Sequence, residues 1–152
     1  MSPGQSPSLR TVDTKRVQMK PRTPGFEEYL AGAFFGYTLA TLPLQVIILI
    51  LQLSSINPEV LDVTTLTLLF IGPNLFGGAM SGYLVARRSD TEHWKVGLKN
   101  GIGCLILSGL ITGLLTGQQE SLLALAGKFV GSSISGYLYG RVYQARALQS
   151  QK

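Results

Sequence analysis

Charged residues are scarce in this sequence. Asp, Glu, Lys and Arg make up 14% of the chain, whereas a soluble globular domain carries roughly 25%. The chain has one cysteine, Cys104, so a disulfide framework within one chain is excluded. It has one histidine, His93, and no second histidine or acidic residue is spaced to hold a metal with it. These shortages argue against a soluble domain, a disulfide-rich domain and a metal centre.

Motifs that carry chemistry are also missing. The serines have no base beside them, because the single histidine falls in a predicted loop. The Gly101-Ile102-Gly103 run lacks the third glycine and the preceding strand of a dinucleotide-binding fingerprint, and there is no P-loop. We therefore expect no enzyme activity from this chain alone, and no cofactor.

Long apolar segments fill most of the chain. A helix needs about 20 apolar residues to cross a hydrocarbon core of about 30 Å, and it must satisfy its own backbone hydrogen bonds there. Because the apolar runs are continuous rather than alternating, strands are not expected. The sequence predicts an all-α membrane protein whose four transmembrane helices lie at about 29–53, 64–86, 95–116 and 120–141. The transmembrane domain spans 27–141, between a disordered basic tail at 1–26 and a polar tail at 142–152.

Basic residues alternate between the two sides of this arrangement. They stand before the first helix, between the second and third, and after the fourth, whereas the other two loops contain no Lys or Arg. This pattern follows the positive-inside rule and predicts that both termini are cytoplasmic. The net charge of +5 therefore reflects topology. We expect the lipid bilayer, and no nucleic acid, as the partner of these bases.

A short segment occurs twice. Residues 76–87 read FGGAMSGYLVAR and residues 130–141 read VGSSISGYLYGR. A fainter match relates the segment that begins at Tyr29 to the one that begins at Trp94. Since two helices restore the original direction of the chain, the sequence predicts two tandem parallel hairpin repeats.

Glycines at spacing four recur in all four predicted helices. In lipid, small residues let helix backbones approach closely, and dispersion then holds the helices together. We expect tight packing, within one chain or between chains, so that self-association or other membrane subunits are predicted partners. The predicted packing residues are Gly32, Gly36, Gly78, Gly82, Gly97, Gly101, Gly109, Gly113, Gly131, Gly136 and Gly140.

Lys128 is the ionisable residue predicted to lie deepest in the membrane. It stands 13 residues before Arg141, about 20 Å along a helix. Ser132 and Ser135 follow on the same face, and the repeat aligns Lys128 with Asn74. These four residues form either a polar intramembrane site or a lysine that extends toward outer headgroups near Glu120, with an asparagine bonded to a neighbouring helix. Both interpretations stay open at this point.

The segments Gly77–Leu84 and Trp94–Gly101 carry a resemblance. They share a G-G-x-x-x-G-Y-L helix end, a short polar loop and a G-x-x-x-G helix start with the small glycine-rich four-helix integral membrane proteins of archaea and bacteria, which are catalogued as families of unknown function. The resemblance implies this fold and the prokaryotic cytoplasmic membrane, and it brings no activity. Two functions follow as hypotheses: a non-catalytic oligomeric bundle or accessory subunit, and a small channel or transporter with a polar path near Asn74 and Lys128.

Overall fold

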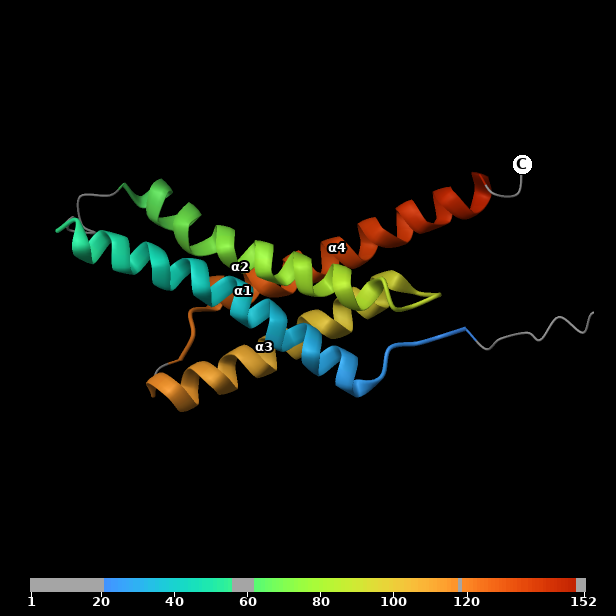
Figure 1. The fold of residues 1–152 in the computed structure, drawn as a ribbon, viewed down its shortest axis with the longest axis horizontal. Coiled ribbons are helices and arrows are strands. Elements are labelled where there is room, and N and C mark those ends of the chain that lie inside the picture. The colour runs from blue at the N-terminus through green and yellow to red at the C-terminus, as the bar shows by residue number, and fades with distance from the viewer. Residues whose placement is uncertain (1–20, 56–61, 118, 150–152) are drawn as a thin grey trace, which may run out of the picture.

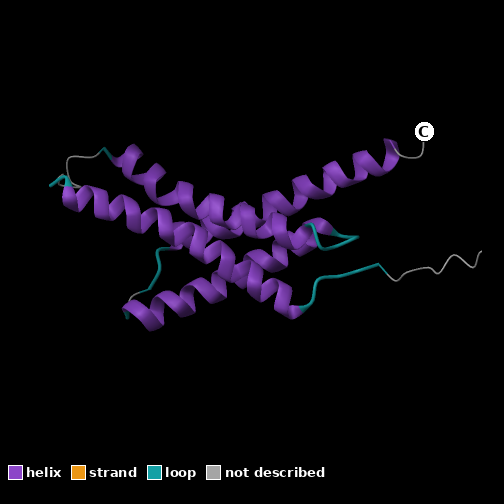
Figure 2. Cartoon of the chain, viewed as in Figure 1, coloured by secondary structure: helices purple, strands orange, loops and turns teal. Residues whose placement is uncertain are grey.

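The computed structural model describes residues 21–55, 62–117 and 119–149. The chain is all-helical, and no strand occurs in those ranges (Figures 1 and 2). The four helices are α1 (Phe26–Leu53), α2 (Val63–Ala86), α3 (His93–Thr116) and α4 (Leu122–Gln149). Most of the predicted N-terminal tail, residues 1–20, lies outside the described residues.

The helix boundaries follow the prediction closely except at the end of α4. The first three helices end where the sequence places their ends, at residues 53, 86 and 116. By contrast, α4 continues past residue 141 to Gln149, so residues 142–149, predicted as a polar tail, are helical. The residues after Gly140 include neither glycine nor proline and favour helix, and Arg146 in the last turn suits the negative end of the helix dipole.

Three helices, α1, α2 and α3, are long and apolar enough to cross a membrane. In composition, α4 is more polar, since it contains Lys128, several serines and Arg141. It packs against both α2 and α3, so much of its surface meets protein, and a helix placed that way needs fewer apolar side chains. That α4 also crosses the membrane, as the sequence predicts, is taken up below as a proposal.

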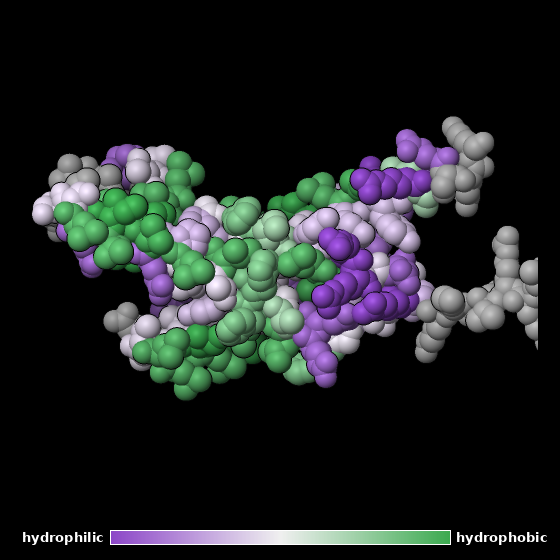
Figure 3. All heavy atoms as spheres, in the orientation of Figure 1, coloured by the Kyte–Doolittle hydropathy of each residue, from purple (hydrophilic) through white to green (hydrophobic). Residues whose placement is uncertain are grey.

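The distribution of side chains is the reverse of that in a soluble protein. The largest fully buried side chains are Lys128, Asn74, Asn100, Cys104, Ser81, Ser108 and Ser132. Large apolar side chains are exposed on every helix, and Figure 3 shows them as a broad apolar surface over much of the molecule. In water such a surface would be a liability, whereas in lipid it is the expected exterior.

One end of the helical bundle is more hydrophilic than the other (Figure 3). The start of α1, the α2–α3 connection and the end of α4 lie toward one end of the molecule (Figure 1). Hydrophilic side chains gather at this end, on the right of Figure 3. There, the carboxylate of Asp90 in the α2–α3 connection accepts a hydrogen bond from the backbone N–H of Arg22 at 2.9 Å. The backbone N–H of Asp90 donates a second one to the carbonyl of Arg22 at 3.1 Å. The chain before α1 is thereby fastened to the α2–α3 connection.

Asp62 caps the start of α2 at the opposite end. Its carboxylate accepts hydrogen bonds from the hydroxyl and the backbone N–H of Thr65 and from the backbone N–H of Thr64. These bonds satisfy donors that a helix start leaves free. These hydrogen bonds stabilise the charged carboxylate and hold the pKa of Asp62 below its ordinary value. The bond from the Thr65 hydroxyl has the largest effect.

Candidate functional site

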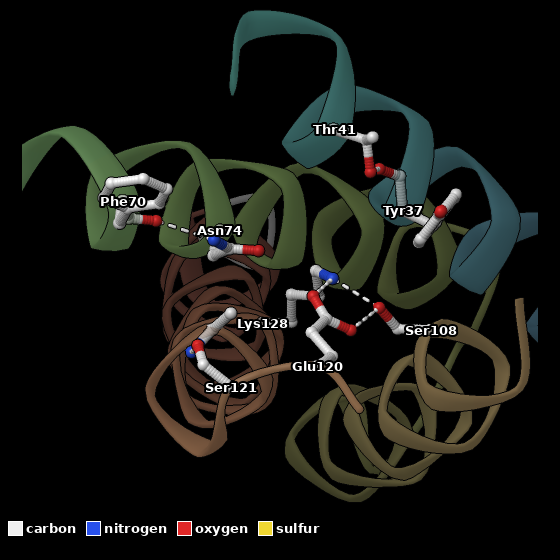
Figure 4. A network of polar contacts seen from close by, with 9 residues as sticks. Tyr37, Thr41, Phe70, Asn74, Ser108, Glu120, Ser121 and Lys128 are labelled. Atoms are coloured by element: carbon white, nitrogen blue, oxygen red, sulfur yellow. Dashed lines mark hydrogen bonds and ion pairs between the residues drawn. The ribbon is translucent and has the colours of Figure 1, made fainter. Parts of the chain in front are cut away.

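Lys128 lies inside the bundle, in a closed triangle of polar groups (Figure 4). Its ammonium donates to one carboxylate oxygen of Glu120 and to the hydroxyl of Ser108, and that hydroxyl donates to the other oxygen of Glu120. The side chains of Lys128 and Glu120 are 1% and 13% exposed. The triangle thus joins α3, α4 and the connection between them.

Tyr37 of α1 completes the surroundings of the ammonium. The nitrogen of Lys128 lies 5.2 Å from the centre of the Tyr37 ring, in cation–π geometry. An ammonium has three protons, and here Glu120, Ser108 and the ring provide three partners. The charge is therefore balanced by a carboxylate and its donors are in use, which is the condition for keeping an ion pair in a low-dielectric interior.

The partners of Lys128 were not predicted from the sequence. The sequence places Glu120 near the outer headgroups and gives no role to Ser108 or Tyr37. In the structure, the chain after α3 runs back toward the middle of the bundle before α4 begins (Figure 1), which carries Glu120 inward. A signal was available, because a lysine buried in a membrane helix requires a counter-ion and Glu120 is the nearest acidic residue along the chain.

Asn74 of α2 lies next to this cluster and is 1% exposed. Its side-chain nitrogen donates to the carbonyl of Phe70 at 2.6 Å. Its side-chain oxygen is buried and has no hydrogen-bond partner among the described residues. Asn74 and Lys128 therefore lie in one region of the bundle (Figure 4), and the side-chain oxygen of Asn74 is an acceptor there that no described residue uses.

Ser132 and Ser135, predicted to share this site, form hydrogen bonds outside the Lys128 cluster. The hydroxyl of Ser132 donates to the carbonyl of Gly97 at 2.8 Å, and that of Ser135 donates to the carbonyl of Ser132 at 3.0 Å. The predicted four-residue site therefore divides in two, with Asn74 and Lys128 in one cluster and the serines nearer the polar end. The reason is helical rise, because the serines lie one and two turns beyond Lys128.

A second buried network is centred on Asn100 of α3. Its side-chain amide donates to the hydroxyls of Ser81 on α2, at 2.7 Å, and Ser132 on α4, at 3.0 Å. Ser81 in turn donates to the carbonyl of Gly32 on α1. One side chain thus links all four helices. The sequence predicts no role for Asn100.

Most of the predicted packing glycines lie where helices touch backbone to backbone or nearly so. A methyl group at Gly78 or Gly82 of α2 would come within 3.0 Å of the α4 backbone, and one at Gly131 of α4 would come as close to the α2 backbone. At Gly97 and Gly136 a methyl group would also come within 3.0 Å of backbone atoms. At Gly32, Gly36 and Gly101 the atoms within 3.0 Å belong to side chains. At Gly140 the nearest atom, the β-carbon of His93, would lie at 3.2 Å. Gly77, absent from the predicted set, also packs closely, against Gly36 and Ala40.

Gly109 and Gly113, two of the predicted packing residues, are not packed against any other described helix. A methyl group at either would meet nothing within 4 Å. They lie in the second half of α3, which diverges from α1 and α2 in Figure 1. Their neighbours Ile106, Leu110 and Leu114 are exposed. This part of α3 therefore offers a ridge of small and apolar residues with no partner among the described residues.

The buried side chains of the candidate site are joined by hydrogen bonds and one ion pair. Within the described ranges, no three His, Cys, Asp or Glu side chains come together. Cys104 is buried, with its sulfur 3.6 Å from the hydroxyl of Ser81. Comparison with known proteins finds no matching family model, no matching curated protein and no matching solved structure.

Proposed function

We propose that this protein is a non-catalytic polytopic membrane protein that works as a tightly packed oligomeric bundle or as an accessory subunit of a membrane complex. The observation that carries the proposal is the contrast between two sets of glycines. Those near the centre bring α2 and α4 into backbone contact, whereas Gly109 and Gly113 meet nothing. A rigid bundle with an unused ridge of small residues fits a protein that binds another membrane helix.

The proposal includes a topology. We place all four helices across the prokaryotic cytoplasmic membrane, as two tandem parallel hairpin repeats with both termini in the cytoplasm. The gathering of bases at the end that contains the start of α1 and the end of α4 supports this orientation. The acceptor carbonyls of the Asn100 network, Gly32 and Gly97, are equivalent in the fainter alignment of the repeats, which supports duplication. Reporters fused to each end should both report the cytoplasm, and opposite compartments would contradict this topology.

Cysteine crosslinking in native membranes tests the association. In a Cys104→Ala background, Gly113→Cys should give a disulfide-linked dimer if the chain self-associates. A crosslinked band of another mass is expected if the partner is a different subunit and the reagent carries a thiol-reactive group at one end and a photoreactive group at the other. Leu49→Cys on α1, which is 53% exposed, is the matched control and should give neither. A monomer at both positions would contradict the proposal.

A second candidate function, a small channel or transporter, is favoured by the polar cluster. An ionisable residue inside a membrane bundle is by default a functional hypothesis, and Asn74 leaves one buried oxygen without a partner there. Both α1 and α2 also contain a proline, at Pro43 and Pro73. Flux of small ions into liposomes that contain the purified protein would support this candidate if it is abolished in the double variant Lys128→Met/Glu120→Gln, which leaves no buried charge without a counter-ion. Absence of flux would leave the subunit proposal as the one to pursue.

A further inference from the structure

A cavity of about 330 Å³ opens between the first turns of α1 and the last turn of α2. Its lining combines two kinds of residue. Phe35 and Leu84 contribute apolar wall, and Arg87, Arg88 and Glu28 contribute charge. The volume is at the lower end of the range for small-molecule sites. It lies at the polar end of the bundle, where the apolar surface gives way to hydrophilic side chains.

One basic side chain that lines the cavity has no acidic partner among the described residues. The carboxylate of Glu28 is already shared by Arg22, at 2.7 Å, and Arg88, at 3.3 Å. It also accepts the backbone N–H of Gly25 at 3.0 Å. Arg87 is exposed and forms no ion pair with any residue in the described parts of the chain. The lining therefore has an excess of positive charge, and Arg87 is the guanidinium available for an anion.

The position of the cavity restricts the anion that would bind. A soluble phosphate would use Arg87 but would gain nothing from the apolar wall. A phospholipid places its phosphate at the boundary and its acyl chains beside the exposed apolar side chains of α1, where Phe35 is 39% exposed. Basic pockets between membrane helices are suited to anionic headgroups. A guanidinium presents several donors in the geometry that a phosphate accepts.

We infer that this cavity binds an anionic phospholipid, with Arg87 on the phosphate and the Phe35–Leu84 wall against the first part of an acyl chain. The inference goes beyond the proposed function and requires only that the chain lies in a membrane. It does not depend on whether the chain self-associates, so the two proposals can fail separately.

The test uses a tryptophan in the cavity wall. Trp94 is the only tryptophan of the chain, so Phe35→Trp in a Trp94→Phe background gives a single reporter. The full-length protein is reconstituted in phosphatidylcholine vesicles, and brominated phosphatidylglycerol or brominated phosphatidylcholine is added as quencher. We expect the anionic lipid to reach half-maximal quenching at about one fifth of the mole fraction that the zwitterionic lipid needs, the preference that one basic residue near a membrane surface gives.

Matched variants separate the cavity from general surface charge. Arg87→Gln should remove the preference. Arg87→Lys should retain part of it, because the charge stays while the paired donors of the guanidinium are lost, and it shows that position 87 accepts substitution. Arg146→Gln, which removes one exposed charge on α4, should leave the preference unchanged.

Three outcomes would overturn the inference. The first is equal quenching by the two lipids in the reporter protein. The second is an equal loss of preference in Arg87→Gln and Arg146→Gln. The third is recovery of the fluorescence on addition of inorganic phosphate or an acidic peptide, which would assign the cavity to a soluble anion or a protein partner.

Discussion

Asn100 on α3 donates a hydrogen bond to the hydroxyl of Ser81 on α2 at 2.7 Å, and both residues are fully buried. The hydroxyl of Ser81 donates a hydrogen bond to the carbonyl of Gly32, and the hydroxyl of Ser132 donates one to the carbonyl of Gly97. The amide of Asn100 therefore lies between two hydroxyl–carbonyl pairs. One pair joins α1 to α2 and the other joins α3 to α4. The amide is therefore a central polar link between the two helical hairpins.

Replacing Asn100 with leucine should weaken the association of the hairpins without removing either pair. Ser81 and Ser132 keep their carbonyl acceptors, so no hydroxyl proton is left without a partner. Two interhelical bonds at about 0.6 kcal/mol each predict a loss of about 1 kcal/mol in the free energy of unfolding. Unfolding in mixed detergent micelles with increasing dodecyl sulfate measures it. Ser133→Ala, which removes only a bond to Phe129 in its own helix, is the control, and an equal loss there would argue against the link.

Lys128 and Glu120 should behave as a coupled pair. Lys128→Met leaves a carboxylate with little exposure and no counter-ion, and breaking a buried pair in this way costs about 3 kcal/mol or more. Glu120→Gln should be comparably harmful, because it leaves the ammonium uncompensated. The double variant should recover most of the loss, since no charge then stays buried. The free energies of unfolding of the four proteins close the cycle, and additive losses would mean that the two charges do not interact.

The helices were predictable because lipid imposes a simple rule on them. Continuous apolar runs of sufficient length predicted α1, α2 and α3, and the spacing of the glycines predicted the close contacts at Gly78, Gly82 and Gly131. For Lys128 the sequence left two interpretations open, a buried polar site and a lysine that extends toward the headgroups, and the side chain is 1% exposed. Each of these features depends on local sequence and on a periodicity that the sequence displays.

The partners of the buried polar groups were not predictable in the same way. The contact of Glu120 with Lys128 depends on how far the chain returns after α3, which spacing along a helix does not determine. The central role of Asn100 depends on the rotation of three helices at once. Likewise, Gly109 and Gly113 have the same spacing as the glycines that pack, and only the divergence of α3 separates them.

The cap at the start of α2 should depend on pH. The pKa of Asp62 is held below its ordinary value of 3.8, so its contribution is present above that value and is lost as the pH falls through the lowered pKa. Asp62→Asn can still cap the helix but does not titrate. The difference in unfolding free energy between wild type and Asp62→Asn should be constant above about pH 5 and should shift against wild type at lower pH. A difference that does not change with pH would show that the negative charge of Asp62 adds nothing to folding.

Two helical glycines with different surroundings offer the sharpest test of backbone contact. A methyl group at Gly78 of α2 would come within 3.0 Å of the backbone of Lys128, whereas one at Gly109 of α3 would meet no described residue within 4 Å. Gly78→Ala should force α2 and α4 apart and cost about 1–3 kcal/mol in the free energy of unfolding, as overpacking does. Gly109→Ala should be neutral or stabilising by up to about 1 kcal/mol, since alanine favours helix. Detergent unfolding of both variants decides the matter: equal effects would mean that glycine acts through helix propensity alone, and that α2 and α4 do not approach as closely as the fold requires.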